Sequence, residues 1–211
     1  MKTGKNLRAE KLIGSLAASL TAIFAITALF FFIQFMFCFV SAKNIPGINN
    51  YPLVRVMVYG SSYEQDRYTV SARISLLDSD STEFAVIERS WKGTSLSILF
   101  LGASFSEKTV WFPFCVSGHD NPSEDVFNIG RKGTKLSPYY NENGLCLLFG
   151  SRNPEKLQRS LMHLFAYAAI SRFRPSSKHS VQKEINLAEC ENGANYTIYT
   201  DFTGALFMSK D

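Results

Sequence analysis

The sequence predicts an α+β fold, in which one N-terminal transmembrane helix precedes a single extracytoplasmic domain of mainly antiparallel β-strands with one long covering α-helix. Three observations predict it. Residues 12–40 contain no charged side chain. Residues 53–116 consist of short apolar or alternating segments separated by polar turns. Residues 154–173 carry apolar side chains at helical spacing between clear start and stop signals.

The uncharged N-terminal segment is long enough to span a membrane, since about 20 apolar residues cross a hydrocarbon core of about 30 Å. Four basic residues precede it against the single acid Glu10, whereas the first residues after it contribute only Lys43. The positive-inside rule therefore predicts a cytoplasmic N-terminus and an extracytoplasmic domain. The expected parts are a basic tail at 1–11, a transmembrane signal anchor at 12–40, a linker at 41–52 and a domain at 53–211.

A secreted protein is the alternative to the anchor. Val40 and Ala42 occupy the two positions that a signal peptidase inspects, so cleavage after Ala42 would release the domain. The apolar cores of signal peptides run about 7 to 15 residues, and this segment is much longer, which favours the anchor. Small residues four apart, Gly14, Ala18 and Ala22, would allow self-association through the helix. Another envelope protein is the other partner that the location suggests.

The domain is expected to begin as a meander of five strands. Valines alternate in residues 53–59, residues 67–76 alternate strictly between apolar and polar, and further strands are expected at 83–91, 96–105 and 110–116. A long irregular connection at 117–150 follows, with a short strand at 145–149. One or two more strands are expected at 196–202 and 205–208.

The sequence contains clear start and stop signals for the covering helix. Asn153 is suited to the N-cap, Pro154 to the first helical position, and Pro175 to ending the helix. Its apolar stripe includes Leu164, which we expect to be buried together with Ile74 of the second strand.

Charge and motifs exclude several classes of function. Residues 1–42 hold four of the 22 Lys/Arg and one of the 18 Asp/Glu, so 18 and 17 remain and the rest of the chain has a net charge of +1. A nearly neutral domain without a basic cluster predicts no nucleic-acid partner. Asp78 and Asp80 imitate a calcium loop, but Glu83 stands where the loop needs glycine. We expect neither a metal nor a cofactor.

Catalytic candidates are few. His119 and Asp120 are adjacent in the long connection, and His163 lies on the predicted helix. Since neighbouring residues do not easily face each other, and no GxSxG, HExxH, GxxxxGK or GxGxxG motif occurs, a non-catalytic binding or scaffolding domain of unknown ligand is the leading hypothesis. The alternative is a membrane-anchored hydrolase with its site in residues 117–150.

Cysteine usage gives no disulfide framework. Cys38 lies in the apolar segment and three cysteines lie in the exported part. Buried thiols are the favoured interpretation. If a disulfide forms, Cys115 and Cys146 are the expected pair.

Overall fold

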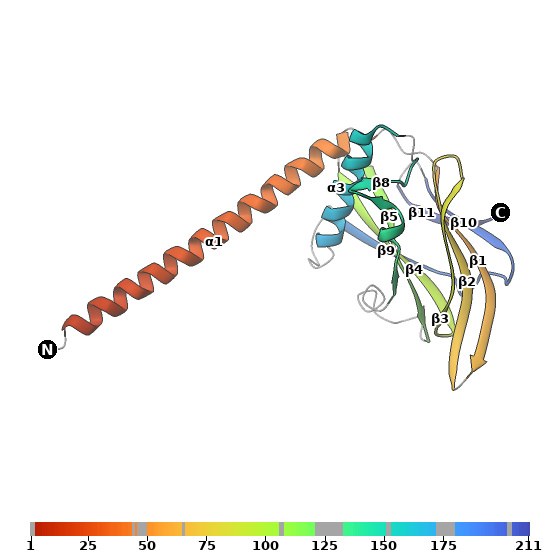
Figure 1. The fold of residues 1–211 in the computed structure, drawn as a ribbon, viewed down its shortest axis with the longest axis horizontal. Coiled ribbons are helices and arrows are strands. Elements are labelled where there is room, and N and C mark those ends of the chain that lie inside the picture. The colour runs from red at the N-terminus through yellow and green to blue at the C-terminus, as the bar shows by residue number, and fades with distance from the viewer. Residues whose placement is uncertain are drawn as a thin grey trace. The chain divides into compact units, whose positions relative to one another are not determined.

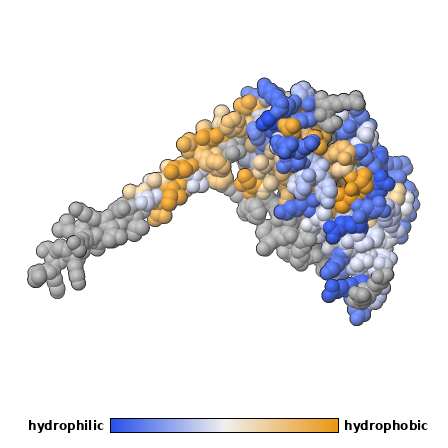
Figure 2. Space-filling model, in the orientation of Figure 1, coloured by the Kyte–Doolittle hydropathy of each residue, from blue (hydrophilic) through white to orange (hydrophobic). Residues whose placement is uncertain are grey.

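The computed structural model describes residues 3–43, 45, 50–64, 66–105, 108–120, 133–150, 153–171, 180–201 and 204–211. It divides into two compact units, residues 1–37 and 38–211. The first unit is most of helix α1 (Thr3–Lys43). The stretch Ala17–Lys43 of this helix is long and apolar enough to cross a membrane, and Figure 2 shows its largely apolar surface in orange. The hydroxyls of Thr21 and Thr27 donate to carbonyls one turn earlier, at 2.8 Å, which lowers the cost of placing them among lipids.

The second unit has three layers, and Figure 1 shows them in order as helix α3 (Glu155–Ser171), a four-stranded sheet B and a five-stranded sheet A. Sheet A has the strand order β11-β10-β1-β2-β3 and sheet B the order β6-β5-β4-β9. All the pairings recorded in them are antiparallel. The strands of sheet A are β1 (Tyr51–Glu64), β2 (Arg67–Leu77), β3 (Glu83–Lys92), β10 (Asn195–Thr200) and β11 (Leu206–Lys210). Those of sheet B are β4 (Ser95–Phe105), β5 (Lys108–His119), β6 (Thr134–Lys135) and β9 (Ser180–Asn186). A short 3-10 helix (Ser137–Tyr139) and the hairpin of β7 (Asn141–Glu142) and β8 (Leu145–Cys146) precede α3.

Sheet B is the middle layer, so its central strands are buried on both faces. One face of β4 and β5 lies against α3, where the ring of Phe105 contacts Tyr167 with centroids 5.1 Å apart. The other face lies against sheet A, where the Trp111 indole N–H donates to the carbonyl of Gly204. Because side chains alternate along a strand, odd-numbered residues of β4 face α3 and even-numbered ones face sheet A.

The structure confirms the predicted α+β class and the burial of Leu164 and Ile74, both 0% exposed. The five predicted strands are present, but they do not form one sheet. The chain leaves sheet A after β3 and enters sheet B at β4, so the meander is divided and α3 covers only the second part. The predicted end of the helix at residue 173 lies outside the described residues.

The end of α1 belongs to the folded domain. Cys38, Ser41 and Ala42 are buried, and the Cys38 thiol lies 3.6 Å from the carbonyl of His163 in α3. The Lys108 ammonium donates to the carbonyl of Ile45 at 3.4 Å. Residues 44 and 46–49 of the predicted linker lie outside the described residues.

Candidate functional site

His119 ends β5 and is buried, with 3% of its surface exposed. Its Nε2 lies 2.7 Å from the Ser97 hydroxyl and its Nδ1 lies 3.2 Å from the Ser95 hydroxyl. Among the described residues, the Glu184 carboxylate approaches the ring, with its Oε1 4.0 Å from Nε2. Both ring nitrogens therefore have hydroxyl partners, which is what a buried polar side chain requires.

This cluster resembles a nucleophile and its base, but the strand geometry buries His119 and leaves Ser95 only half-buried. Ser97 is fully buried. Ser95 is paired with His119, so both side chains project towards the layer of α3. A cavity of about 140 Å³ is lined by residues including Ser95, Leu96 and Val58, and it lies on the sheet A side, to which Leu96 projects. Alternation along β4 directs the Ser95 side chain towards the other sheet face, where its hydroxyl lies beside His119, and we interpret His119 as a structural residue of the core.

The other two predicted catalytic residues have separate environments. Asp120 is exposed, and its backbone carbonyl accepts from the Thr94 hydroxyl at 3.4 Å. His163 lies on an exposed position of α3. His119 is hydrogen-bonded to serines of β4 rather than to Asp120. The geometry thus gives no support to a site built on these three residues.

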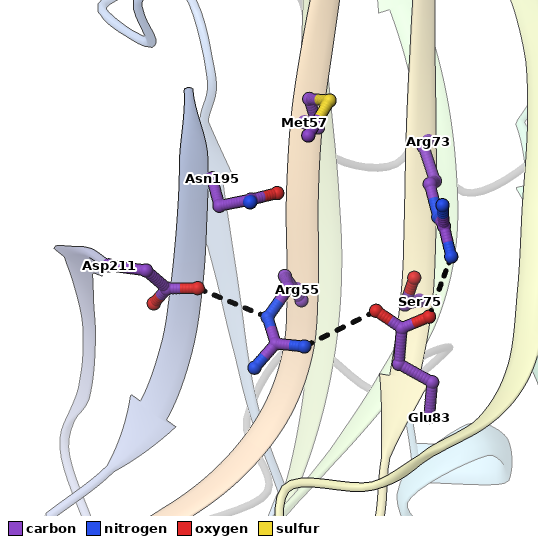
Figure 3. A pocket seen from close by; sticks show the side chains of 7 residues that line it. All are labelled: Arg55, Met57, Arg73, Ser75, Glu83, Asn195 and Asp211. Atoms are coloured by element: carbon purple, nitrogen blue, oxygen red, sulfur yellow. Dashed lines mark hydrogen bonds and ion pairs between the residues drawn. The ribbon is translucent and has the colours of Figure 1, made fainter. Parts of the chain in front are cut away.

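A different group of polar residues lines a pocket of about 190 Å³ on the face of sheet A that points away from sheet B. Figure 3 shows them on β1, β2, β3 and β10 and just beyond β11. The lining residues are Arg55, Met57, Arg73, Ser75, Glu83, Asn195 and Asp211. The register explains their convergence, because Met57 lies opposite both Asn195 and Arg73 in the neighbouring strands.

Ion pairs organise this pocket. The Arg55 guanidinium donates through Nη1 to Glu83 at 3.3 Å and through Nε to Asp211 at 3.1 Å, and Arg73 donates to the second Glu83 oxygen at 2.8 Å. Burial alone would raise the pKa of Glu83, but the hydrogen bond and charge of Arg73 and the hydrogen bonds from Arg55 and Ser75 outweigh burial and lower the pKa. Glu83 is therefore the shared counter-ion that fixes both guanidinium groups.

The pocket could not be predicted from the sequence, because its residues have the same pattern as the solvent-facing residues of ordinary strands. Arg55 pairs with residues 28 and 156 positions away, so no local motif contains the group. The only local signal is that Arg55 and Met57 alternate with buried valines, which marks their strand face without marking a site.

The cysteines and the calcium-like turn do not form sites in the described residues. All four cysteines are buried and in the thiol form, including Cys115 and Cys146. Burial raises the pKa of Cys146 to about 12, and burial together with Glu189 raises that of Cys190 to about 11. The Asp78 carboxylate accepts from the backbone N–H groups of residues 80 and 82, which is a turn-forming role. Within the described ranges, no group of three or more His, Cys, Asp or Glu side chains is arranged to hold a metal ion.

Comparison with known proteins gives no relative from which a function could be transferred, since no family model, curated protein or solved structure matches the chain.

Proposed function

We propose that this protein is a single-pass, membrane-anchored envelope protein whose exported domain binds a ligand or a partner and catalyses no reaction. The apolar helix supports the anchor. A cytoplasmic N-terminus, with the domain on the other side of the membrane, is supported by the basic residues before the span, Lys2, Lys5, Arg8 and Lys11.

The packing of the helix end favours an anchor over a cleaved signal peptide. Cleavage after Ala42 would remove Cys38 and Ser41 from the folded unit in which they are buried. A protease needs an extended and accessible segment, whereas residues 38–43 are helical.

The observation that carries the binding function is the contrast between the two polar groups of the domain. His119 and Ser97 are buried and Ser95 is half-buried, whereas Arg55, Arg73 and Glu83 line an open pocket on the outer sheet face, with side chains 26–42% exposed. Polar groups that are already held in position in a solvent-accessible pocket are suited to recognising a ligand.

Single-cysteine labelling tests the topology, since all four native cysteines are buried and contribute little background. Asp80→Cys places a thiol in the exposed turn between β2 and β3, and Lys5→Cys places one in the basic tail. A membrane-impermeant maleimide should label the Asp80→Cys protein on intact cells and the Lys5→Cys protein only after lysis. The reverse pattern would refute the proposed orientation. A mature protein that begins at Lys43 would refute the anchor.

A further inference from the structure

The charges of the outer-face pocket are balanced, but its hydrogen-bonding capacity is not used up. Arg55 and Arg73 offset Glu83 and Asp211 in charge. A guanidinium carries five N–H groups, whereas Arg55 donates two of them and Arg73 one. Both side chains therefore keep N–H groups for which the described residues supply no acceptor.

Acceptors also remain in the pocket. Arg55 engages Asp211 through Oδ2, which leaves Oδ1 on the same carboxylate, and the side-chain amide of Asn195 is part of the lining. Thr197 lies opposite Arg55 in the neighbouring strand, on the same sheet face. Its hydroxyl is buried and has no hydrogen-bond partner among the described residues. Thr197 is fully buried and lies outside the lining, so the acceptors that the pocket offers a ligand are those of Asp211 and Asn195.

We propose that the pocket binds a small zwitterion carrying one carboxylate and one ammonium group, as a free α-amino acid does. This inference rests on the proposed binding function. The ligand carboxylate would lie against the remaining N–H groups of Arg73 and Arg55, whose planar forks match carboxylate geometry. The ligand ammonium would lie beside Asp211. A zwitterion keeps the pocket neutral, whereas an anion or a cation alone would leave one unpaired charge in a partly buried site.

The size of the pocket agrees with such a ligand. The pocket has a volume of about 190 Å³. Pockets for drug-sized ligands are larger, at about 300 to 1,000 Å³. The pocket therefore suits a small molecule, such as an amino acid, better than a drug-sized one.

Binding should be measured on the full chain in nanodiscs of neutral lipid, by calorimetry and by the shift in melting temperature. The probes are the standard α-amino acids, with acetate, methylammonium and inorganic phosphate as single-charge comparisons. At least one amino acid should bind at least tenfold more tightly than each single-charge probe. Acetate or phosphate binding as tightly as every amino acid would overturn the proposal, and so would an absence of binding by all the probes.

Two variants connect the binding to the pocket. Arg73→Gln removes a guanidinium that faces the pocket, and Asp211→Asn removes the charge expected to meet the ammonium. Each substitution should weaken the binding of the amino acid by roughly tenfold or more, as the loss of a charged hydrogen-bond partner does. Arg67→Gln is the matched control, because Arg67 is an exposed arginine on the same strand but outside the lining. Circular dichroism should show the same fold in all three variants.

An effect of Arg67→Gln equal to that of Arg73→Gln would overturn the assignment to this pocket. The labelling experiment and the binding experiment can fail independently of each other. Labelling as predicted without any probe binding would reject the zwitterion and keep the anchored protein, whereas binding with reversed labelling would keep the ligand class and reject the orientation.

Discussion

The close approach of β3 and β5 can be tested with one added methyl group. A Cβ atom at Gly118 would lie 2.1 Å from the Lys92 carbonyl oxygen, which is 1.3 Å less than the 3.4 Å at which ordinary contact begins. The obstacle is backbone at the point where the chain crosses from sheet A to sheet B, so it cannot move aside as a side chain would. Overpacking costs typically 1–3 kcal/mol, and for Gly118→Ala we expect roughly 3 kcal/mol or more.

Thermal unfolding of the full chain in nanodiscs, followed by near-ultraviolet circular dichroism, measures this effect. A loss of about 3 kcal/mol should lower the melting temperature by about 6–12 °C in a protein of this size. Gly144→Ala is the control, because its φ of +81° disfavours alanine while no atom lies within 4 Å of the added Cβ. It should cost only about 1 kcal/mol. A Gly118→Ala protein that melts within about 2 °C of the parent would show that the two strands do not approach in this way.

Two further predictions concern the core and the pocket. Leu164→Ala should destabilise the chain by roughly 2–5 kcal/mol in urea titrations, because Leu164 is buried between α3 and sheet B, whereas exposed Lys156→Ala should change stability by less than about 0.5 kcal/mol; equal effects would contradict that packing. Since the native pKa of Glu83 is lowered, its contribution to stability is present above the ordinary value of 4.5 and is lost as the pH falls below it. Melting curves between pH 7 and 3 should therefore show a smaller acid loss for Glu83→Gln than for the parent, and identical pH profiles would contradict the role of the ion pairs.

Local periodicity predicted the elements because it records which faces are apolar. Strand β2 alternates so strictly that its buried residues, such as Val70 and Ile74, could be named in advance. The same alternation predicted that Tyr68 faces inward, yet Tyr68 is 49% exposed and contacts Tyr63 at the end of the β1–β2 hairpin. Alternation gives the side of the sheet to which a residue projects, but not how far the next layer extends beneath it.

Non-local pairing could not be predicted in the same way. Strand β9 was not predicted, because its residues are mostly polar and Val181 is exposed. The strand exists because it pairs with β4 along seven residues. The place where the chain changes sheets likewise needs two glycines, because a Cβ at Gly93 would meet the backbone of His119 and a Cβ at Gly118 would meet the backbone of Lys92. Two glycines among polar residues carry no sequence signal that distinguishes a crossing between sheets from an ordinary hairpin.

The two polar groups of the domain show why sequence proximity misled the search for a site. His119 and Asp120 are neighbours in the chain, but the end of β5 sends His119 into the layers and leaves Asp120 at the surface. Arg55, Glu83 and Asp211 are far apart in the chain, yet the strand order β11-β10-β1-β2-β3 brings them to one face. Recognition at this pocket would therefore depend on the pairing of β1 with β10 and of β10 with β11, because the two pairings together bring Asp211 beside Arg55.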